Sequence, residues 1–192
     1  MLARYERLLA LYPMRVKSLL GCSASFAGDT TAQAIEQYGV APERQASGHF
    51  EYDHRRGAAL TSLGTFWNGP VIHLYFGALE RMFPRKPSEL GALARKTAFN
   101  QLVMNPFVYL PLFYLWTGAC AGLSAQQMVD KAQAEYLSTL LAAWGIFTPA
   151  NLVNFHFVPL RHQQAFHLAV SYIYNTAMSL LAAPRRLHGQ EP

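Results

Sequence analysis

The chain has 192 residues, 52% hydrophobic and 14% charged, which fits a single domain on the apolar, charge-poor side of ordinary globular usage. The formal net charge of +5 comes from Lys and Arg residues that bracket apolar segments, whereas nucleic-acid binding would gather them on one face with interleaved aromatic residues. Cys22 and Cys120 form no Cys-x-x-Cys pair and give no disulfide framework, so nothing indicates the secretory pathway.

Residues 1–15 are rich in Arg and Leu and contain one acid, a composition that fits a mitochondrial targeting segment and an interfacial amphipathic helix equally well. A weaker helix is expected over residues 16–38. Its small residues, Gly28 among them, recur every fourth position and allow another helix to approach closely. Asp29 and Gln33 form a polar stripe beside them, which we expect to point into a bundle.

Four windows farther along the chain contain no Asp, Glu, Lys or Arg: residues 57–79, 97–129, 136–160 and 162–184. Each is long enough for a helix to cross a bilayer core, which takes roughly 20 residues. A soluble helix keeps a charged face toward water, so these windows belong in lipid or inside a bundle. We therefore predict an all-α fold, with residues 1–192 as one membrane domain. It is a polytopic transmembrane helical bundle with four strong spans and the weaker N-terminal helix.

The connections between these segments are polar or basic. Residues 39–56 are expected to form a polar connection, and residues 80–96 a basic one with proline helix stops. Ser124 and Gln127 have capping-box spacing and predict a new helix start. Residues 161–164 are expected to form a tight turn between the last two windows, and residues 185–192 a flexible tail. If all five helices span, the amino terminus and the 80–96 connection lie on one side, with most Lys and Arg, facing matrix or cytosol.

Prolines and one carboxylate stand inside the apolar segments. Pro70, Pro106, Pro111 and Pro149 each remove a backbone donor, so they are expected to kink their helices, either as packing geometry or as the lining of a pathway. Asp29 is the carboxylate, with Arg55, Arg56 or His73 as candidate partners. It either lines a hydrated path or locks helices together.

Amide side chains recur at the depth of the predicted spans, where single amides usually join helices and several converging amides would make a wet interior. The candidate residues of a pore or polar interior are Asp29, Gln33, Asn68, His73, Gln101, Asn105, Asn151, Asn154 and Asn175. The chain has no His-Glu-x-x-His, Gly-x-Ser-x-Gly, P-loop or metal-ligand spacing, so we expect neither enzymatic activity nor a cofactor. Asn154 and Asn175 are expected on the inner side of a hairpin of the last two helices, with Arg161 at headgroup level, free to hold lipid phosphate.

The densest motif is Trp144-x-x-Phe147-Thr148-Pro149-x-Asn151-x-x-Asn154-Phe155-x-x-Val158-Pro159-x-x-x-His162, with Arg161 inside it. With Gly28-Asp29 and Gly69-Pro70-x-x-His73 upstream, it resembles the signature of the family of Mpv-seventeen and peroxisomal membrane protein twenty-two. The resemblance covers nearly the whole chain. The residues that carry it include Gly28, Gly69, Pro70, Pro106, Trp144, Phe155, Pro159 and Arg161. The chain departs from the family at Asn100, where the family usually has Asp, and at Tyr174, where it has Trp.

The resemblance implies an integral protein of an organellar membrane, with the mitochondrial inner membrane favoured and the peroxisomal membrane as the alternative. It further implies that the protein forms or regulates a pore for small solutes and supports organelle homeostasis. The alternative is a non-conducting scaffold that binds anionic lipid through its basic connections. The expected partners are membrane lipids, anionic ones above all, and small solutes; a homo-oligomer is left open.

Overall fold

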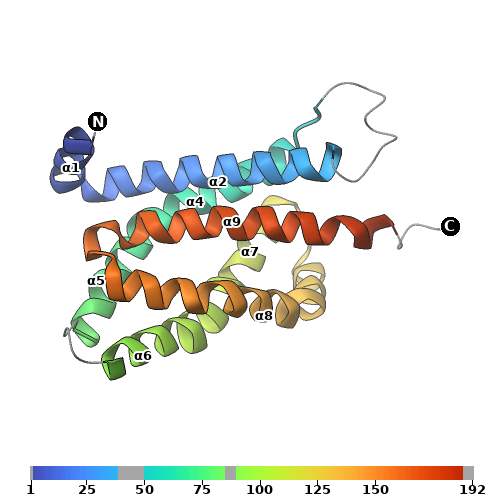
Figure 1. The fold of residues 1–192 in the computed structure, drawn as a ribbon. Helices are drawn as coiled ribbons and strands as arrows, with labels where there is room; N and C mark the ends of the chain where they lie inside the picture. Colours follow the sequence, from blue (N-terminus) through green and yellow to red (C-terminus); the bar gives the residue numbers. More distant parts are fainter. Residues whose placement is uncertain (1, 39–49, 85–89, 188–192) are drawn as a thin grey trace.

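The computed structural model describes residues 2–38, 50–84 and 90–187, with side chains placed in residues 3–38, 50–84 and 90–174. The described residues are helical and form long rods that lie side by side (Figure 1). In chain order the elements are α1 (Leu2–Leu11), α2 (Pro13–Tyr38), α4 (His54–Phe66), the π-helix η1 (Trp67–Val71), α5 (Ile72–Met82), α6 (Leu90–Phe99), the π-helix η2 (Asn100–Tyr109), α7 (Leu110–Cys120), α8 (Ala125–Phe157) and α9 (Leu160–Leu187). The prediction of an all-α fold is confirmed for this part of the chain.

Several short elements follow one another without a break and act as single rods. One rod is α4, η1 and α5, and another is α6, η2 and α7. With α2, α8 and α9 they make a bundle in which α1 lies at one end, beside the starts of α2 and α9 and the turn from α8 to α9 (Figure 1). We call this the α1 end. The end of α9 and the start of α4 lie at the opposite end.

Two of the rods in the described residues are long and apolar enough to cross a membrane, Leu90–Cys120 and Ala125–Phe157. Only 22% and 17% of their most apolar windows are buried inside the bundle, so most of that apolar surface faces outward. Such an exposed apolar surface is typical of contact with lipid. The four strong spans predicted from charge-free windows are not confirmed. Windows 57–79 and 162–184 lie in other long helices, which are not among the candidate spans found in the described residues.

The helix starts follow local sequence chemistry. The predicted capping box is confirmed, because Gln127 N donates to Ser124 Oγ while Ser124 N donates to the Gln127 side chain. Asp53 caps α4, accepting from Arg56 N at 3.0 Å. The weaker N-terminal helix is present, and it begins at Pro13, where the missing N–H costs no intrahelical bond.

The predicted connections differ from the observed ones. The polar connection, predicted over residues 39–56, ends earlier because α4 begins at His54, and residues 39–49 lie outside the described residues. The basic connection, predicted over residues 80–96, is wrong at both ends, since α5 continues to Met82 and α6 begins at Leu90. The turn between the last two helices lies at Val158 and Pro159, ahead of residues 161–164, which form the first turn of α9. Val158 is extended because it precedes proline, and the Pro159 carbonyl accepts the first bonds of α9. Part of the predicted tail is helical, since α9 runs to Leu187, and residues 188–192 lie outside the described residues.

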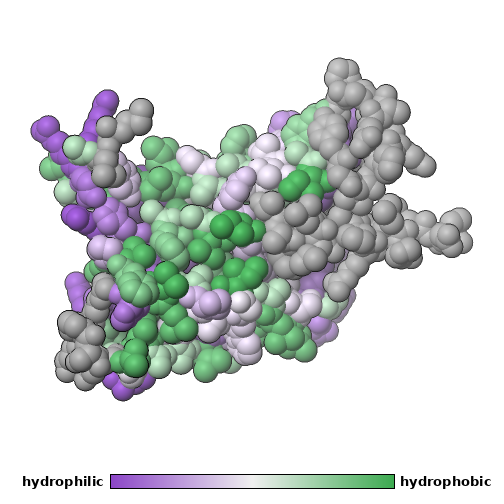
Figure 2. All heavy atoms as spheres, viewed as in Figure 1, coloured by the Kyte–Doolittle hydropathy of each residue, from purple (hydrophilic) through white to green (hydrophobic). Residues whose placement is uncertain are grey.

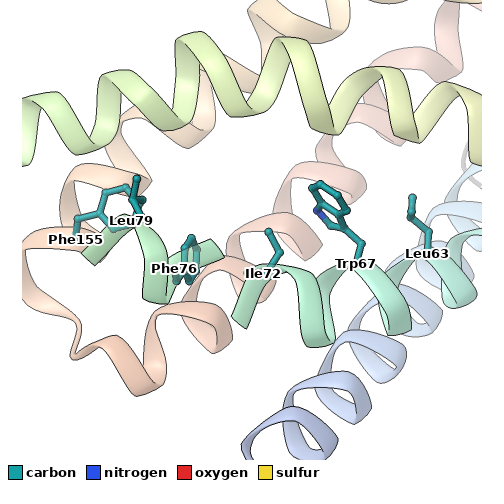
Figure 3. Close-up of a cluster of buried hydrophobic side chains, with 6 residues drawn as sticks. All are labelled: Leu63, Trp67, Ile72, Phe76, Leu79 and Phe155. Carbon is teal, nitrogen blue, oxygen red and sulfur yellow. The ribbon is translucent and has the colours of Figure 1, made fainter. Parts of the chain in front are cut away.

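The apolar core is built mainly by one rod. Leu63, Trp67, Ile72, Phe76 and Leu79 follow one another along α4, η1 and α5, and Phe155 of α8 packs against them (Figure 3). On another side of this rod, glycines allow α2 to approach closely. A Cβ on Gly21 would lie 2.3 Å from the Gly64 carbonyl oxygen, so only glycine fits there.

The outside of the bundle is apolar and much of its inside is polar. Figure 2 shows apolar residues across the middle of the visible face and hydrophilic residues gathered at the α1 end. Large apolar side chains such as Leu102, Phe107 and Leu137 are exposed. The buried polar or charged side chains are Lys17, Asp29, Gln33, Gln37, Lys96, Thr97, Gln101, Asn151, Asn154, Gln163 and Gln164. An apolar outer surface combined with this many buried polar side chains is unusual for a soluble protein and typical of a membrane bundle.

Candidate functional site

The buried carboxylate of Asp29 is surrounded by partners. Arg56 Nε lies 2.9 Å from Asp29 Oδ1, and the Asp29 side chain is fully buried. Asp29 Oδ2 accepts from Gln33 Nε2 at 2.8 Å and from the Tyr52 hydroxyl at 3.1 Å. A second carboxylate, that of Glu36, accepts from Arg56 Nη1 at 2.8 Å. Of the partners considered from sequence, it is therefore Arg56 that pairs with Asp29.

Arg56 and Tyr52, which lie at the start of α4 and just before it, hold their protons firmly. Burial lowers the pKa of the Arg56 guanidinium, but its bonds and charge attraction to Glu36 and Asp29 outweigh burial and raise that pKa. Burial also raises the pKa of the Tyr52 hydroxyl, and the Asp29 charge adds to the rise. Both groups thus keep their protons beside the Asp29 carboxylate, Arg56 as its ion-pair partner and Tyr52 as a hydrogen-bond donor.

The same cluster ties the segment before α4 onto α2. Asp53 N donates to Gln33 Oε1 at 2.7 Å, and Gln33 Nε2 reaches the Asp53 carbonyl at 3.3 Å. One turn farther, Glu51 N donates to Gln37 Oε1 at 3.1 Å. The Asp29 cluster, consisting of Asp29, Gln33, Glu36, Tyr52 and Arg56, is therefore a paired junction between α2 and α4.

A second polar group, the amide cluster, lies in the half of the bundle toward the α1 end. Its members, each at most 4% exposed, are Gln101, Asn151, Asn154, Gln163 and Gln164. Asn154 Nδ2 donates to the Gln163 carbonyl at 3.0 Å, and Gln163 Nε2 donates to the Val158 carbonyl at 3.2 Å. These two bonds join α8 to the first turn of α9 and close the hairpin.

The face of α8 that turns toward α6 and η2 carries Trp144, Asn151 and Phe155, which follow one another at helical spacing. Trp144 Nε1 donates to the Gln101 carbonyl at 2.9 Å, and the centroid of the Phe155 ring lies 4.9 Å from Lys96 Nζ. Asn151 stands between these two contacts on the same face. It therefore faces the segment from Lys96 to Gln101.

Most of the amide cluster keeps polar atoms that have no partner among the described residues. They are Gln101 Nε2, Asn151 Nδ2, Asn154 Oδ1, Gln163 Oε1 and both polar atoms of Gln164. A buried amide left without a hydrogen bond costs about 1–3 kcal/mol. Several such atoms in one region therefore favour an interior that water enters.

In the rod made of α6, η2 and α7, two prolines leave backbone carbonyls without donors, and side chains of α8 donate to these carbonyls instead. In a π-helix the N–H of a residue bonds the carbonyl five positions earlier, and Leu110 N donates to the Asn105 carbonyl in this way. In that register Pro106 has no N–H for the Gln101 carbonyl. Pro111 likewise has no N–H for the Pro106 carbonyl. Trp144 caps the first, and the Tyr136 hydroxyl caps the second at 2.5 Å.

Two buried lysines lie near the α1 end. Lys17 Nζ lies 2.9 Å from His73 Nδ1, and since an ammonium can only donate, this ring nitrogen is the acceptor. Lys96 pairs with Glu80 and stands over the Phe155 ring. His73, considered from sequence as a partner of Asp29, therefore belongs to a different contact.

The other predicted interior residues are less central. Asn68 is half-buried, close to Gly21, and Asn105 donates to Gln101 Oε1 at a long 3.4 Å. Asn175 belongs to α9, but its side chain lies outside the described part. The structure thus divides the predicted polar interior into the Asp29 cluster and the amide cluster, in opposite halves of the bundle. Among the described residues, no group of three or more His, Cys, Asp or Glu side chains is placed to hold a metal ion.

Sequence reasoning missed several buried polar residues. Gln163 and Gln164 were assigned to a turn, and Lys96 to a connection. Lys17 was not considered for the interior, and Glu80, which is half-buried, was assigned to the same connection as Lys96. The one available signal was Glu80 and Lys96, which stand on either side of a proline-containing connection, where an antiparallel hairpin brings them together.

Arg161, in the first turn of α9, has a partner on α1. Its Nη1 lies 3.4 Å from Glu6 Oε2, and His162 Nε2 lies 3.0 Å from Glu6 Oε1. The first helix is therefore pinned to the start of α9. The Arg161 side chain is nevertheless 67% exposed and keeps further donors.

Comparison with known proteins shows which family the chain resembles. The family model described as "Mpv17 / PMP22 family" matches residues 118–179. Mitochondrial inner membrane protein Mpv17 of Homo sapiens is 32% identical over 178 residues, which are 91% of this chain and 93% of that protein. The chain belongs to the Mpv17/PMP22 family. PXMP2/4 family protein 1 of Dictyostelium discoideum is 29% identical over 184 residues, 93% of this chain and 82% of that protein. No solved structure matches the chain.

The family membership agrees with the motif-based resemblance, and the structure gives several motif residues of this Mpv17/PMP22 member a local role. The matched residues 118–179 include all of α8. Trp144 caps a stranded carbonyl, Phe155 packs in the apolar core, and Pro159 starts α9. Gly69 lies where α2 approaches, since a Cβ there would sit 2.0 Å from Ser18 Oγ.

Proposed function

We propose that this Mpv17/PMP22 protein forms or regulates a pore for small solutes in an organellar membrane and so supports homeostasis of the organelle. The mitochondrial inner membrane is the favoured location, because relatives over nine-tenths of the chain carry that location in their names. The relative named PXMP2/4 family protein 1 keeps the peroxisomal membrane as the alternative. The proposed function needs no catalytic residue and no cofactor.

The observation that carries the proposal is the amide cluster. Its buried amide atoms without protein partners lie where α8 meets η2 and α9, inside a bundle whose outer surface is apolar. Water is the ordinary partner of such atoms when the protein supplies none. A hydrated column lined by amides would pass small polar solutes without selecting strongly for charge.

The Asp29 cluster supports a structural role, and not a role in solute passage, for the half of the bundle away from the α1 end. Asp29 forms an ion pair with Arg56 at Oδ1 and accepts from Gln33 and Tyr52 at Oδ2, so its charge is already compensated within the protein. We therefore assign the Asp29 cluster to locking α2 and α4, and the amide cluster to the solute path. The four-span count, with α2 as a fifth span, remains part of the proposal.

The second candidate function is a non-conducting scaffold that binds anionic lipid. Exposed arginines at the α1 end, including Arg4, Arg7, Arg15 and Arg161, favour it. Both functions use the same bundle, and a homo-oligomer is compatible with either. Conductance separates them.

The experiment is single-channel recording of the purified full-length protein in planar bilayers. We expect discrete conductance steps that Gln164→Leu and Asn151→Leu reduce, while the matched exposed variant Val153→Leu leaves them unchanged. Melting curves in detergent establish that each variant is folded. Absence of conductance, with the protein demonstrably inserted, overturns the pore and leaves the scaffold.

A further inference from the structure

An apolar groove of about 400 Å³ runs between α2 and α9. Its walls include Leu20 and Ala24 on α2, and Ala165, Leu168 and Ala169 on α9. The alanines make it hollow, because their side chains are too short to fill the space between the two helices. A groove with such walls fits a flexible apolar chain better than a polar solute.

The groove has one closed and one charged end. Toward the opposite end of the bundle, the Thr31 and Tyr172 hydroxyls meet at 3.2 Å and join α2 to α9. Toward the α1 end, Arg161 stands one helical turn before Ala165 and two turns before Leu168, which puts all three on the same face of α9. The Arg161 side chain therefore extends from the α9 face that lines the groove, one helical turn beyond Ala165, and it is 67% exposed.

The first helix indicates that the α1 end of the groove lies at the level of the membrane surface. Glu6 holds α1 to Arg161 and His162, and the Tyr5 ring stacks on His162 with 6.2 Å between ring centroids. The side of α1 away from the bundle exposes Leu8 and Leu11 beside exposed arginines. A helix with exposed leucines and arginines is typical of the boundary between headgroups and acyl chains.

We propose that the groove between α2 and α9 is a binding site for one anionic phospholipid, with an acyl chain along the groove and the phosphate on Arg161. Arginine binds phosphate oxygens through paired donors, and the single contact with Glu6 leaves donors for it. A chain entering from the α1 end reaches as far as the Thr31–Tyr172 contact. The proposal requires membrane insertion but not conductance, so it stands apart from the pore.

The test is native mass spectrometry of the full-length protein, released from detergent after titration with dioleoyl phosphatidylglycerol or dioleoyl phosphatidylcholine. The parent protein is expected to retain one phosphatidylglycerol in preference to phosphatidylcholine. Arg161→Gln should reduce that preference about fivefold, the factor expected for one basic residue at an anionic surface. Arg81→Gln, an exposed arginine at the end of α5, is the matched control and should have no effect.

Filling the groove tests the acyl chain separately. Ala165→Leu with Ala24→Leu should lower retention of both lipids, whereas Ala98→Leu on the exposed side of α6 should not. Equal retention of the two lipids by the parent protein, or an unchanged preference in Arg161→Gln, overturns the phosphate contact. Unchanged retention in the groove-filled variant overturns the groove as the chain's site. A dimer that the filled variant loses would assign the groove to a second copy instead.

Discussion

Trp144 Nε1 donates to the carbonyl oxygen of Gln101 at 2.9 Å, across 43 residues of sequence. This carbonyl is the one that Pro106 leaves without a donor in the π-helical register of η2. A tryptophan of α8 thus replaces the backbone hydrogen bond that a proline removed. Stranded carbonyls inside a membrane need such a donor, and here the protein supplies it.

Trp144→Phe should lower the free energy of unfolding by about 1–3 kcal/mol, because it leaves a buried carbonyl unsatisfied. In a Pro106→Ala background the same change should cost much less, since alanine at that position restores a backbone N–H for the Gln101 carbonyl. The measurement is a double-mutant cycle from melting curves in detergent. Additive effects of the two substitutions would contradict the capping role.

Asp29→Asn should destabilise the bundle and leave its conductance unchanged. The substitution removes the charge that faces Arg56, whose side chain is 33% exposed and keeps Glu36 as a partner, so the expected cost is about 1–3 kcal/mol. Thermal melting in detergent reports the loss, and planar-bilayer recording reports the conductance. Glu51→Gln, an exposed carboxylate near the same junction, is the control and should melt like the parent. A change of ion selectivity without destabilisation would return Asp29 to the solute path.

Asn154→Leu should lower the melting temperature, because the Gln163 carbonyl loses its side-chain donor at the α8–α9 hairpin. Gln163 lies inside α9, where helix geometry supplies its carbonyl with a backbone donor, so the expected cost is about 0.5–1.5 kcal/mol, that of one lost hydrogen bond. Asn105→Leu serves for comparison, since its bond is long and the residue is only half-buried, so its cost should be smaller. If Asn154→Leu melts at or above the parent temperature, the buried amide contributes nothing to the hairpin.

Helix positions could be predicted where the chemistry is local. The capping box of Ser124 and Gln127, the helix predicted over residues 16–38 and the polar stripe of Asp29 and Gln33 all depend on residues within a few positions, although that helix begins earlier, at Pro13. The pairing of Asp29 with Arg56 could be narrowed to a few candidates. It became definite only because glycines let α2 and α4 approach.

The burial of the other polar residues depends on contacts between segments that are distant in sequence. Lys96 reads as part of a basic connection, and it is buried because Glu80 and the Phe155 ring receive its charge. Gln163 and Gln164 read as a turn, yet both are buried because Pro159 starts α9 just ahead of them. A polar residue near an apolar window can be a linker or an interior residue, and its own sequence does not distinguish the two.

The two termini should lie on opposite sides of the membrane. The described rods run between the α1 end and the opposite end, with α1 at one and the end of α9 at the other (Figure 1). Protease protection of a tag at each terminus in sealed organelles measures this. Equal protection of both tags would mean an even number of spans and would remove α2 from the membrane.

Thiol accessibility of the amide cluster tests the hydrated interior most directly. In a background with Cys22→Ser and Cys120→Ser, Gln164→Cys should react with a charged methanethiosulfonate reagent added from the aqueous phase, and the modification should reduce conductance. Leu141→Cys, which is exposed on the outer surface near the middle of α8, should not react, because lipid covers it. Gln164→Cys that reacts no faster than Leu141→Cys, in protein that still melts cooperatively, would contradict a water-filled path through the amide cluster.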